Sequence, residues 1–329
     1  MTTEIAYPLQ QDWYAVAALD ALPEGVIHKA TLLDEDLVIW RQGAAVMVWR
    51  DQCPHRGARL SLGRVANGQL HCGYHGWAFD TQARCVHVPS APDLQMPARA
   101  AAPRCAVQIR AGLVWANLSE HPAPFPSIAC LDEAGFRHLT CGPYTIRASG
   151  PRVIENFLDA AHFPFVHAGY LGVPEHAGLA DYAVERTSDG VRALGLQVFQ
   201  PNYDGSGQAG SVAYDYEVHR PLLASLGKAI DEVRRWAMVF AVSPVSETEV
   251  RAYAVLAQNY PQDTAVEAIR EWEDTITAQD VPIVESQRPL RLPLDPGAEI
   301  HVRADRLAVA YRRYLRDINL RYGVCWADP

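Results

Sequence analysis

The chain has 329 residues, of which 29 are basic, 38 are acidic and 49% are hydrophobic. This composition is typical of a globular protein, and the length predicts one large domain or two ordinary ones. The net charge of −9 argues against a general attraction to nucleic acid or to an anionic membrane. No apolar run reaches the roughly 18 residues of a transmembrane helix, so no membrane span is expected.

The N-terminus and the cysteines together predict a cytoplasmic protein. Glu4 lies where a secretory signal would carry a basic residue, and no apolar segment follows it. The seven cysteines are an odd number spread over a long chain. We therefore expect no disulfide framework, because the cytosol keeps thiols reduced.

The first third of the chain predicts an all-β domain. Residues 12–22 have apolar spacing compatible with a short helix, and from Val26 the period shortens to that of strands. The predicted strands are 27–33, 37–41, 45–49, 69–72, 77–80, 85–88, 106–110 and 113–118.

A second domain is expected after a proline-rich segment with Pro122, Pro124 and Pro126, since prolines at this density interrupt both helix and sheet. We place the domains at 1–120 and 121–329. The second has an α+β pattern, in which an antiparallel sheet is flanked by helices. Its predicted helices are 152–163, 264–288 and 303–321, and its predicted strands are 183–200, 211–220, 236–243 and 248–259.

Two short motifs in the first domain predict a metal centre. Cys53 and His55 are separated by one residue, Cys72 and His75 by two, and sixteen residues lie between the two pairs. Two thiolates and two imidazoles can bind zinc, or a [2Fe–2S] cluster in which two histidines replace two cysteines on one iron. The pattern resembles the signature of Rieske centres, which implies the cluster.

A glycine motif at 205–210 has the G-x-G-x-x-G spacing of dinucleotide-binding loops. The residues that follow it alternate as in a strand, so no helix N-terminus is expected to receive a phosphate. We therefore predict a loop between strands, and no direct binding of NADH.

The second domain contains a further constellation of polar residues. Asn156, Asp159 and His162 recur at every third position, which on a helix places them along one stripe. His167 lies five residues after His162, and on an ideal helix these two side chains would diverge by about 140°. Pro164 lies between them and is expected to kink the helix, which would let both imidazoles converge.

Two histidines need a carboxylate to complete a facial iron site. Asp280 lies on the apolar stripe of the helix predicted at 264–288, and a buried carboxylate requires a partner or a cation. Asp274 and Glu285 are the competing candidates. Asp274 lies off the stripe, and Glu285 is expected to form an ion pair or face solvent.

The segment from Asn156 to His167 resembles the N-x-x-D-x-x-H-x-x-x-x-H motif of Rieske non-haem iron oxygenase α subunits, and the chain as a whole resembles the vanillate O-demethylase type. The resemblance implies a mononuclear Fe(II) bound by His162, His167 and Asp280. It also implies that Asp159 bridges His162 to His75 of a neighbouring subunit in a homotrimer. Electrons from NAD(P)H would arrive through a separate reductase or ferredoxin, because the chain has no flavin motif and no plant-type ferredoxin motif.

Three functions follow from these patterns. The first is a terminal oxygenase that uses O2 to hydroxylate, or to O- or N-demethylate, a small aromatic or heterocyclic substrate. The second is a dioxygenase that forms a cis-diol on an aromatic ring at the same iron. The third is a Rieske electron carrier without catalysis, which would leave His162 and His167 without a function.

Overall fold

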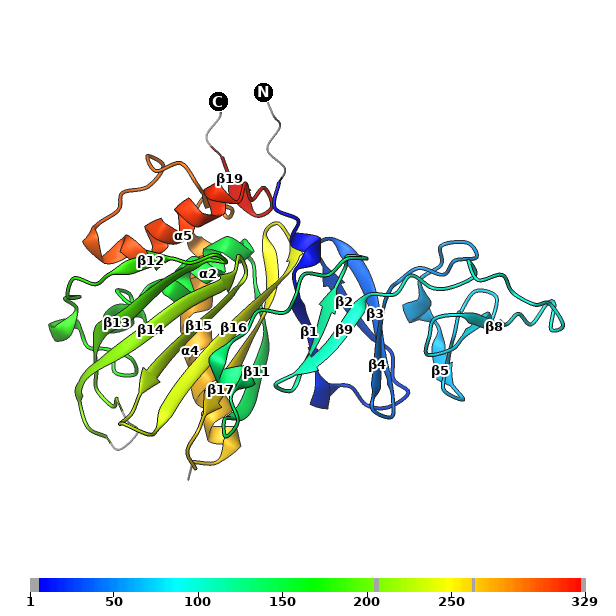
Figure 1. Cartoon of the computed structure of the whole chain (residues 1–329), viewed down its shortest axis with the longest axis horizontal. Helices are drawn as coiled ribbons and strands as arrows, with labels where there is room; N and C mark the ends of the chain where they lie inside the picture. The colour runs from blue at the N-terminus through cyan, green and yellow to red at the C-terminus, as the bar shows by residue number, and fades with distance from the viewer. Residues whose placement is uncertain (1–5, 204–206, 262–263, 327–329) are drawn as a thin grey trace. The chain divides into compact units, whose positions relative to one another are not determined.

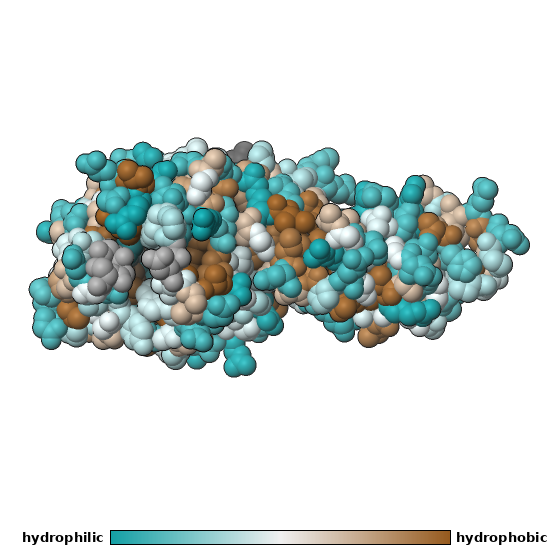
Figure 2. Space-filling model, turned by 90° about the horizontal axis from the view of Figure 1, so that it is seen from below, coloured by the Kyte–Doolittle hydropathy of each residue, from teal (hydrophilic) through white to brown (hydrophobic). Residues whose placement is uncertain are grey.

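The computed structural model describes residues 6–203, 207–261 and 264–326, which form two compact units. One unit comprises residues 9–125, and the other comprises residues from 126 onward together with residues 6–8 (Figure 1). In the described part of the chain, no helix has the length and apolar character needed to cross a membrane. Figure 2 shows hydrophilic residues over much of the visible face.

The N-terminal unit consists of three small antiparallel sheets, with strand orders β1-β10-β9, β2-β3-β4 and β5-β6-β7-β8. Trp40 and Trp49 pack edge to face in its core, with ring centroids 5.5 Å apart. The strands are β1 (Tyr14–Ala18), β2 (His28–Leu32), β3 (Glu35–Gln42), β4 (Ala45–Arg50), β5 (Arg64–Ala66), β6 (Gln69–His71), β7 (Ala78–Phe79), β8 (Cys85–His87), β9 (Ala106–Arg110) and β10 (Leu113–Asn117).

The helix expected at residues 12–22 is wrong. Tyr14–Ala18 forms strand β1, which pairs with β10 in a register that places Tyr14 opposite Ala116. Only a single 3₁₀ turn, Leu19–Ala21, follows it. The alanine-rich run satisfies either period, and pairing with a distant strand decides the outcome.

The C-terminal unit is built on a seven-stranded antiparallel sheet of order β11-β17-β16-β15-β14-β13-β12. Figure 1 shows helix α4, in orange, running along one face of it. The strands are β11 (Arg137–Ile146), β12 (Val184–Arg186), β13 (Val191–Gln200), β14 (Gly210–Arg220), β15 (Leu223–Ala229), β16 (Arg235–Ser246) and β17 (Glu249–Gln258). A short parallel pair joins β18 (Leu292–Pro293) to β19 (Val324–Cys325).

Among its described residues, this unit also has five α-helices: α1 (Ala129–Asp132), α2 (Gly150–Leu158), α3 (Phe163–Val166), α4 (Val266–Ser286) and α5 (Arg306–Asp317). Helix α2 packs against β16, where Phe157 stacks on Phe240 with centroids 5.1 Å apart. Helix α4 packs against β11, and α5 packs against β12 and β13. The expected antiparallel sheet with flanking helices is therefore confirmed.

The glycine motif lies between β13 and β14. Its first two residues, Gly205 and Ser206, fall outside the described residues, and strand β14 begins at Gly210. The chain therefore continues from the motif into a strand, as the alternating pattern predicted.

Helices α2 and α5 are joined by a network of four charges. Arg152 and Arg312 are almost fully buried, and both donate hydrogen bonds to Glu299. Arg152 Nη2 lies 2.7 Å from Glu299 Oε1, and Arg312 Nη2 lies 2.9 Å from Glu155 Oε2. The alternating charges compensate each other where solvent is excluded.

Replacing Glu155 by Leu is expected to lower the free energy of unfolding by about 3 kcal/mol, because it leaves Arg312 buried with half of its partners. Chemical denaturation measures the change. Glu247 forms an ion pair with Arg291 in which both side chains are nearly half exposed, so Glu247→Leu serves as the control, with a loss below about 1 kcal/mol. Equal losses in the two variants would contradict a structural role for the network.

Candidate metal centres

The predicted cluster ligands lie on two loops with the same backbone arrangement. The N–H of Gly57 donates to the carbonyl of Cys53 at 2.9 Å, and the N–H of Gly76 donates to the carbonyl of Cys72 at 3.0 Å. Both glycines have positive φ, 73° and 71°, a conformation that side chains disfavour. Thus the two loops turn alike although their Cys-to-His spacings differ.

The four side chains of these loops are grouped by chemical type. Cys53 and Cys72 are both 3% exposed, and burial together with the Cys72 thiol raises the pKa of Cys53. The rings of His55 and His75 lie with centroids 4.7 Å apart. A Rieske cluster requires two thiolates on one iron and two imidazoles on the other, so this donor set fits it.

A zinc ion fits the same residues poorly. Tetrahedral zinc would hold all four ligand atoms close around a single point. Over the described ranges, the one group with three potential ligand atoms within 4.8 Å of one another is His162, His167 and Asp280. The two loops therefore do not converge on a single ion.

The environment of the His55 ring suits metal binding. Its Nδ1 is buried without a hydrogen-bond partner, and its face stacks on Trp77 at 4.4 Å. Loss of solvent and the neighbouring His75 lower the pKa of His55. The ring is therefore kept in the neutral form that binds metal.

In the C-terminal unit, the helix that carries Asn156 ends earlier than predicted. Helix α2 stops at Leu158, and Asp159 is its C-cap with an extended backbone. His162 and His167 flank the four-residue helix α3, and Pro164 lies in its first turn. Pro164 therefore starts a new helix, where its missing N–H costs nothing, and does not kink a longer one.

This break brings three ligand atoms together. His162 Nε2 lies 3.2 Å from His167 Nε2, and Asp280 Oδ1 lies 3.4 Å and 3.2 Å from these two atoms. These separations would let one metal ion bind all three atoms. Two imidazoles and one carboxylate in this arrangement match the facial set of non-haem Fe(II) sites, which leaves coordination positions open.

Neighbouring side chains orient each ligand. His167 Nδ1 donates to Gln279 Oε1 at 2.8 Å, and His162 Nδ1 lies 3.1 Å from Asp159 Oδ2. Each contact leaves Nε2 to face the centre. Asn156 Nδ2 donates to Asp280 Oδ1 at 3.4 Å. Sequence reasoning missed Gln279, whose one available signal was its position next to Asp280.

The charges of the triad depend on one another. Burial disfavours charged His162, but hydrogen bonds with Asp159 and Asp280 outweigh it and raise its pKa to about 9. Burial also opposes the charge of Asp280, yet hydrogen bonds from both histidines lower its pKa to about 2. Because both carboxylates favour the charged imidazolium, a cation bound at this site would compete with a proton on His162.

The competing carboxylates are engaged elsewhere. Asp274 Oδ1 accepts a hydrogen bond from the Tyr144 hydroxyl at 2.7 Å. Glu285 Oε1 accepts one from the backbone N–H of Arg147 at 2.9 Å. Asp280 is the carboxylate that lies beside both histidines.

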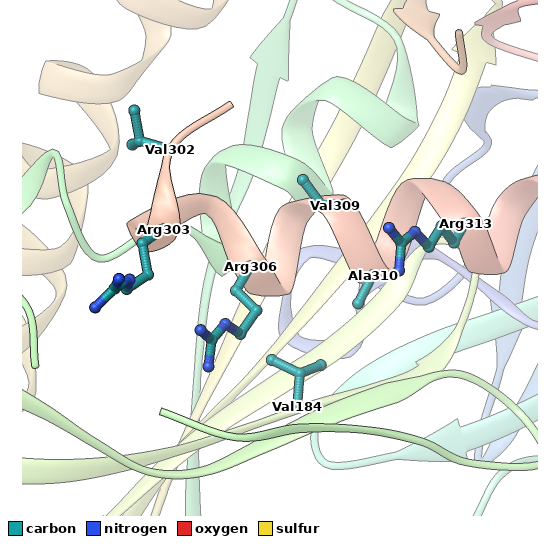
Figure 3. Close-up of a pocket in the computed structure, with 7 residues that line it drawn as sticks. All are labelled: Val184, Val302, Arg303, Arg306, Val309, Ala310 and Arg313. Atoms are coloured by element: carbon teal, nitrogen blue, oxygen red, sulfur yellow. The ribbon is translucent and has the colours of Figure 1, made fainter. Parts of the chain in front are cut away.

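A separate cavity of about 330 Å³ lies along α5, and Figure 3 shows its lining. Its apolar part comes from Val184, Val302, Val309 and Ala310. Arg303, Arg306 and Arg313 supply positive charge, of which Arg306 is paired with Asp181 at 2.7 Å. None of the triad residues lines this cavity.

Comparison with known proteins covers both units. Residues 12–98 match the Rieske [2Fe-2S] domain, and residues 146–319 match the vanillate O-demethylase oxygenase C-terminal domain. Methylxanthine N1-demethylase NdmA of Pseudomonas putida is 31% identical over 324 residues, which cover 94% of this chain and 89% of the relative. Methylxanthine N3-demethylase NdmB of the same species is 27% identical, covering 95% and 90%.

Solved structures share the fold of this chain. NdmA of P. putida CBB5 with caffeine superposes with a TM-score of 0.80 at 28% identity, covering 94% of this chain and 90% of that one. Dicamba monooxygenase bound to 3,6-dichlorosalicylic acid has a TM-score of 0.79 at 21% identity, covering 95% and 98%, and this likeness shows the fold.

The match at 146–319 rules out a bare electron carrier, because a catalytic domain follows the Rieske domain. An oxygenase subunit with these two domains holds a [2Fe–2S] cluster and a mononuclear Fe(II), and it receives electrons from NAD(P)H through a separate reductase. The chain belongs to the Rieske non-haem iron oxygenases, as a catalytic α subunit with a C-terminal domain of the vanillate O-demethylase type.

Proposed function

We propose that this oxygenase removes a methyl group from a ring nitrogen of a small heterocycle, such as an N-methylated purine. The observation that carries the proposal is the triangle of His162 Nε2, His167 Nε2 and Asp280 Oδ1, with sides of 3.2–3.4 Å. It is supported by the similarity to methylxanthine demethylases over nearly the whole chain.

N-demethylation begins with the insertion of one oxygen atom of O2 into a C–H bond of the methyl group. The methyl group becomes hydroxymethyl while the second oxygen atom leaves as water, which consumes two electrons and two protons. The N–CH2OH group then releases formaldehyde and leaves N–H. Bound Fe(II) supplies the site at which O2 is reduced.

Different residues of this chain would bind the mononuclear iron and the Rieske cluster. His162, His167 and Asp280 hold the iron, and Gln279 fixes the ring of His167. In the other unit, the Cys53 and Cys72 thiolates together with the His55 and His75 imidazoles would hold the electron-carrying cluster.

Asp159 passes the electron in this proposal. Its side chain is about one third exposed, while Oδ2 lies 3.1 Å from His162 Nδ1. A partly exposed carboxylate in this place can reach a histidine of another subunit, which here is His75 in a homotrimer. Head-to-tail contacts of this kind close into a ring.

The electron donor in this proposal is a reductase or a ferredoxin.

The proposed compartment is the cytoplasm. All seven cysteines lie within the described residues and none forms a disulfide. This state agrees with a reducing environment.

Product analysis tests the reaction. With a surrogate reductase, NADH and O2, an N-methyl heterocycle is expected to release one formaldehyde for each molecule demethylated, with the new N–H product found by mass spectrometry. Ring cis-diol formation without formaldehyde would contradict N-demethylation and favour dihydroxylation at the same iron.

His162→Ala is expected to lower the iron content from about three to two atoms per chain, because it removes one ligand of the facial set. The visible spectrum of the Rieske cluster should persist. His176, which stacks on Phe199 outside the triad, provides the control, and His176→Ala should keep all three irons. Unchanged iron in His162→Ala, or loss of the Rieske spectrum, would refute the ligand assignment.

Asp159→Asn is expected to keep both metals and to slow reductase-driven turnover about 10- to 100-fold, because the amide cannot hold the His162 ring as the carboxylate does. Single-turnover reduction of the two centres, followed by stopped flow, measures the step. Asp231 lies in an exposed turn with Arg234, and Asp231→Asn should turn over normally. Normal turnover of Asp159→Asn would remove Asp159 from the electron path.

A further inference from the structure

A buried carboxyl group in helix α4 is neither a proposed iron ligand nor part of the four-charge network. Glu273 in α4 is 2% exposed, and its Oε2 is buried without a hydrogen-bond partner in the described structure. A buried polar atom left unpaired costs free energy, so it requires an explanation. A ligand that pairs with it would supply one.

Glu273 lies on the same side of α4 as the iron ligand Asp280. They are seven positions apart, which is about two helical turns, so their side chains point within about 20° of each other. Thr277 occupies the same stripe between them, and both Glu273 and Thr277 are buried. The rise between Glu273 and Asp280 is about 10 Å, comparable to the length of a small bicyclic heterocycle.

The surroundings of Glu273 favour its neutral form. Burial, followed by the charges of Asp280 and Asp274, raises its pKa to about 8. Its charge is also felt by the Cys141 thiol and the Tyr144 hydroxyl on β11. A cation at Asp280 would offset one of these charges, while the effect of burial would remain. At neutral pH the group is therefore a carboxylic acid, with one O–H donor and one carbonyl acceptor.

The sheet that α4 packs against carries buried apolar residues here. Cys141 pairs with Ala254, and Ala254 pairs with Phe240 on the next strand. Phe240 stacks on Phe157 of α2, the residue that follows Asn156. An aromatic ring beside a small alanine, on the sheet that α4 packs against, suits a planar heterocycle.

We propose that Glu273 selects substrates by binding a lactam edge, in which a ring carbonyl lies next to a ring N–H. The acid O–H donates to the carbonyl and the acid C=O accepts from the N–H, so two hydrogen bonds fix the ring. This inference rests on the proposed N-demethylation of a heterocycle and adds the feature that distinguishes one methylated ring from another. Glu273 is thus a specificity residue and takes no part in the chemical step.

Theobromine and caffeine form a matched pair of probes, because they differ only in that caffeine carries a methyl group on the N–H that lies between two carbonyls of theobromine. Binding to the iron-loaded enzyme under anaerobic conditions, measured by calorimetry, requires no turnover. We expect theobromine to bind at least about tenfold more tightly than caffeine, since methylation removes one hydrogen bond and crowds the other.

Glu273→Leu should abolish this preference by weakening theobromine about tenfold or more while changing caffeine less than about threefold. Glu273→Gln retains a donor and an acceptor and should keep part of the preference, which separates recognition from folding. Glu271→Gln, at an exposed position of the same helix, is the control and should bind as the wild type does.

An unchanged preference in Glu273→Leu, or no binding of either purine by the wild type, would overturn the lactam assignment. Formaldehyde release, assayed separately with the wild type, reports on N-demethylation alone. A Glu273-dependent preference without formaldehyde would therefore count against the proposed reaction and leave the recognition role in place.

Discussion

The triad of the C-terminal unit depends on a break in the helix, because α2 ends at Leu158 and α3 begins at Phe163. A continuous helix would direct His162 and His167 about 140° apart, whereas the short linker places their Nε2 atoms 3.2 Å from each other. Helix α4 then brings the Asp280 carboxylate to the same point. Three buried or half-buried polar groups at this distance need a positive charge, which a proton on His162 or a metal ion provides.

The two units bring their candidate metal ligands together by different means. In the N-terminal unit, two loops with matching glycine turns present four candidate ligands in pairs of like atoms. In the C-terminal unit, the two ends of α3 and helix α4 present three candidate ligands around a point. Their orientation comes from Gln279, Asp159 and Asn156. The closed set suits a cluster that carries electrons, and the open set suits an iron that must accept O2 and lie near a substrate.

The sequence predicted most of the N-terminal strands, the sheet-and-helix character of the second domain and the residues that converge at the triad. It missed β11, because the Gly142-Pro143 pair reads as a break. The structure accommodates the proline at a bulge of this edge strand, where no ladder hydrogen bond is required. The break after Leu158 and the bond from His167 to Gln279 were also out of reach, since both depend on where α4 packs. Spacing along the chain identifies donors, but not the backbone that turns them toward one point.

The central claim is that Asp280, together with the two histidines, holds the catalytic iron. The most direct measurement is the electron paramagnetic resonance of the ferrous enzyme exposed to nitric oxide, compared between Asp280→Ala and Asp274→Ala. The account predicts that Asp280→Ala loses the signal of nitric oxide bound to mononuclear iron and keeps that of the reduced Rieske cluster, whereas Asp274→Ala keeps both. A full nitric oxide signal in Asp280→Ala would contradict the assignment.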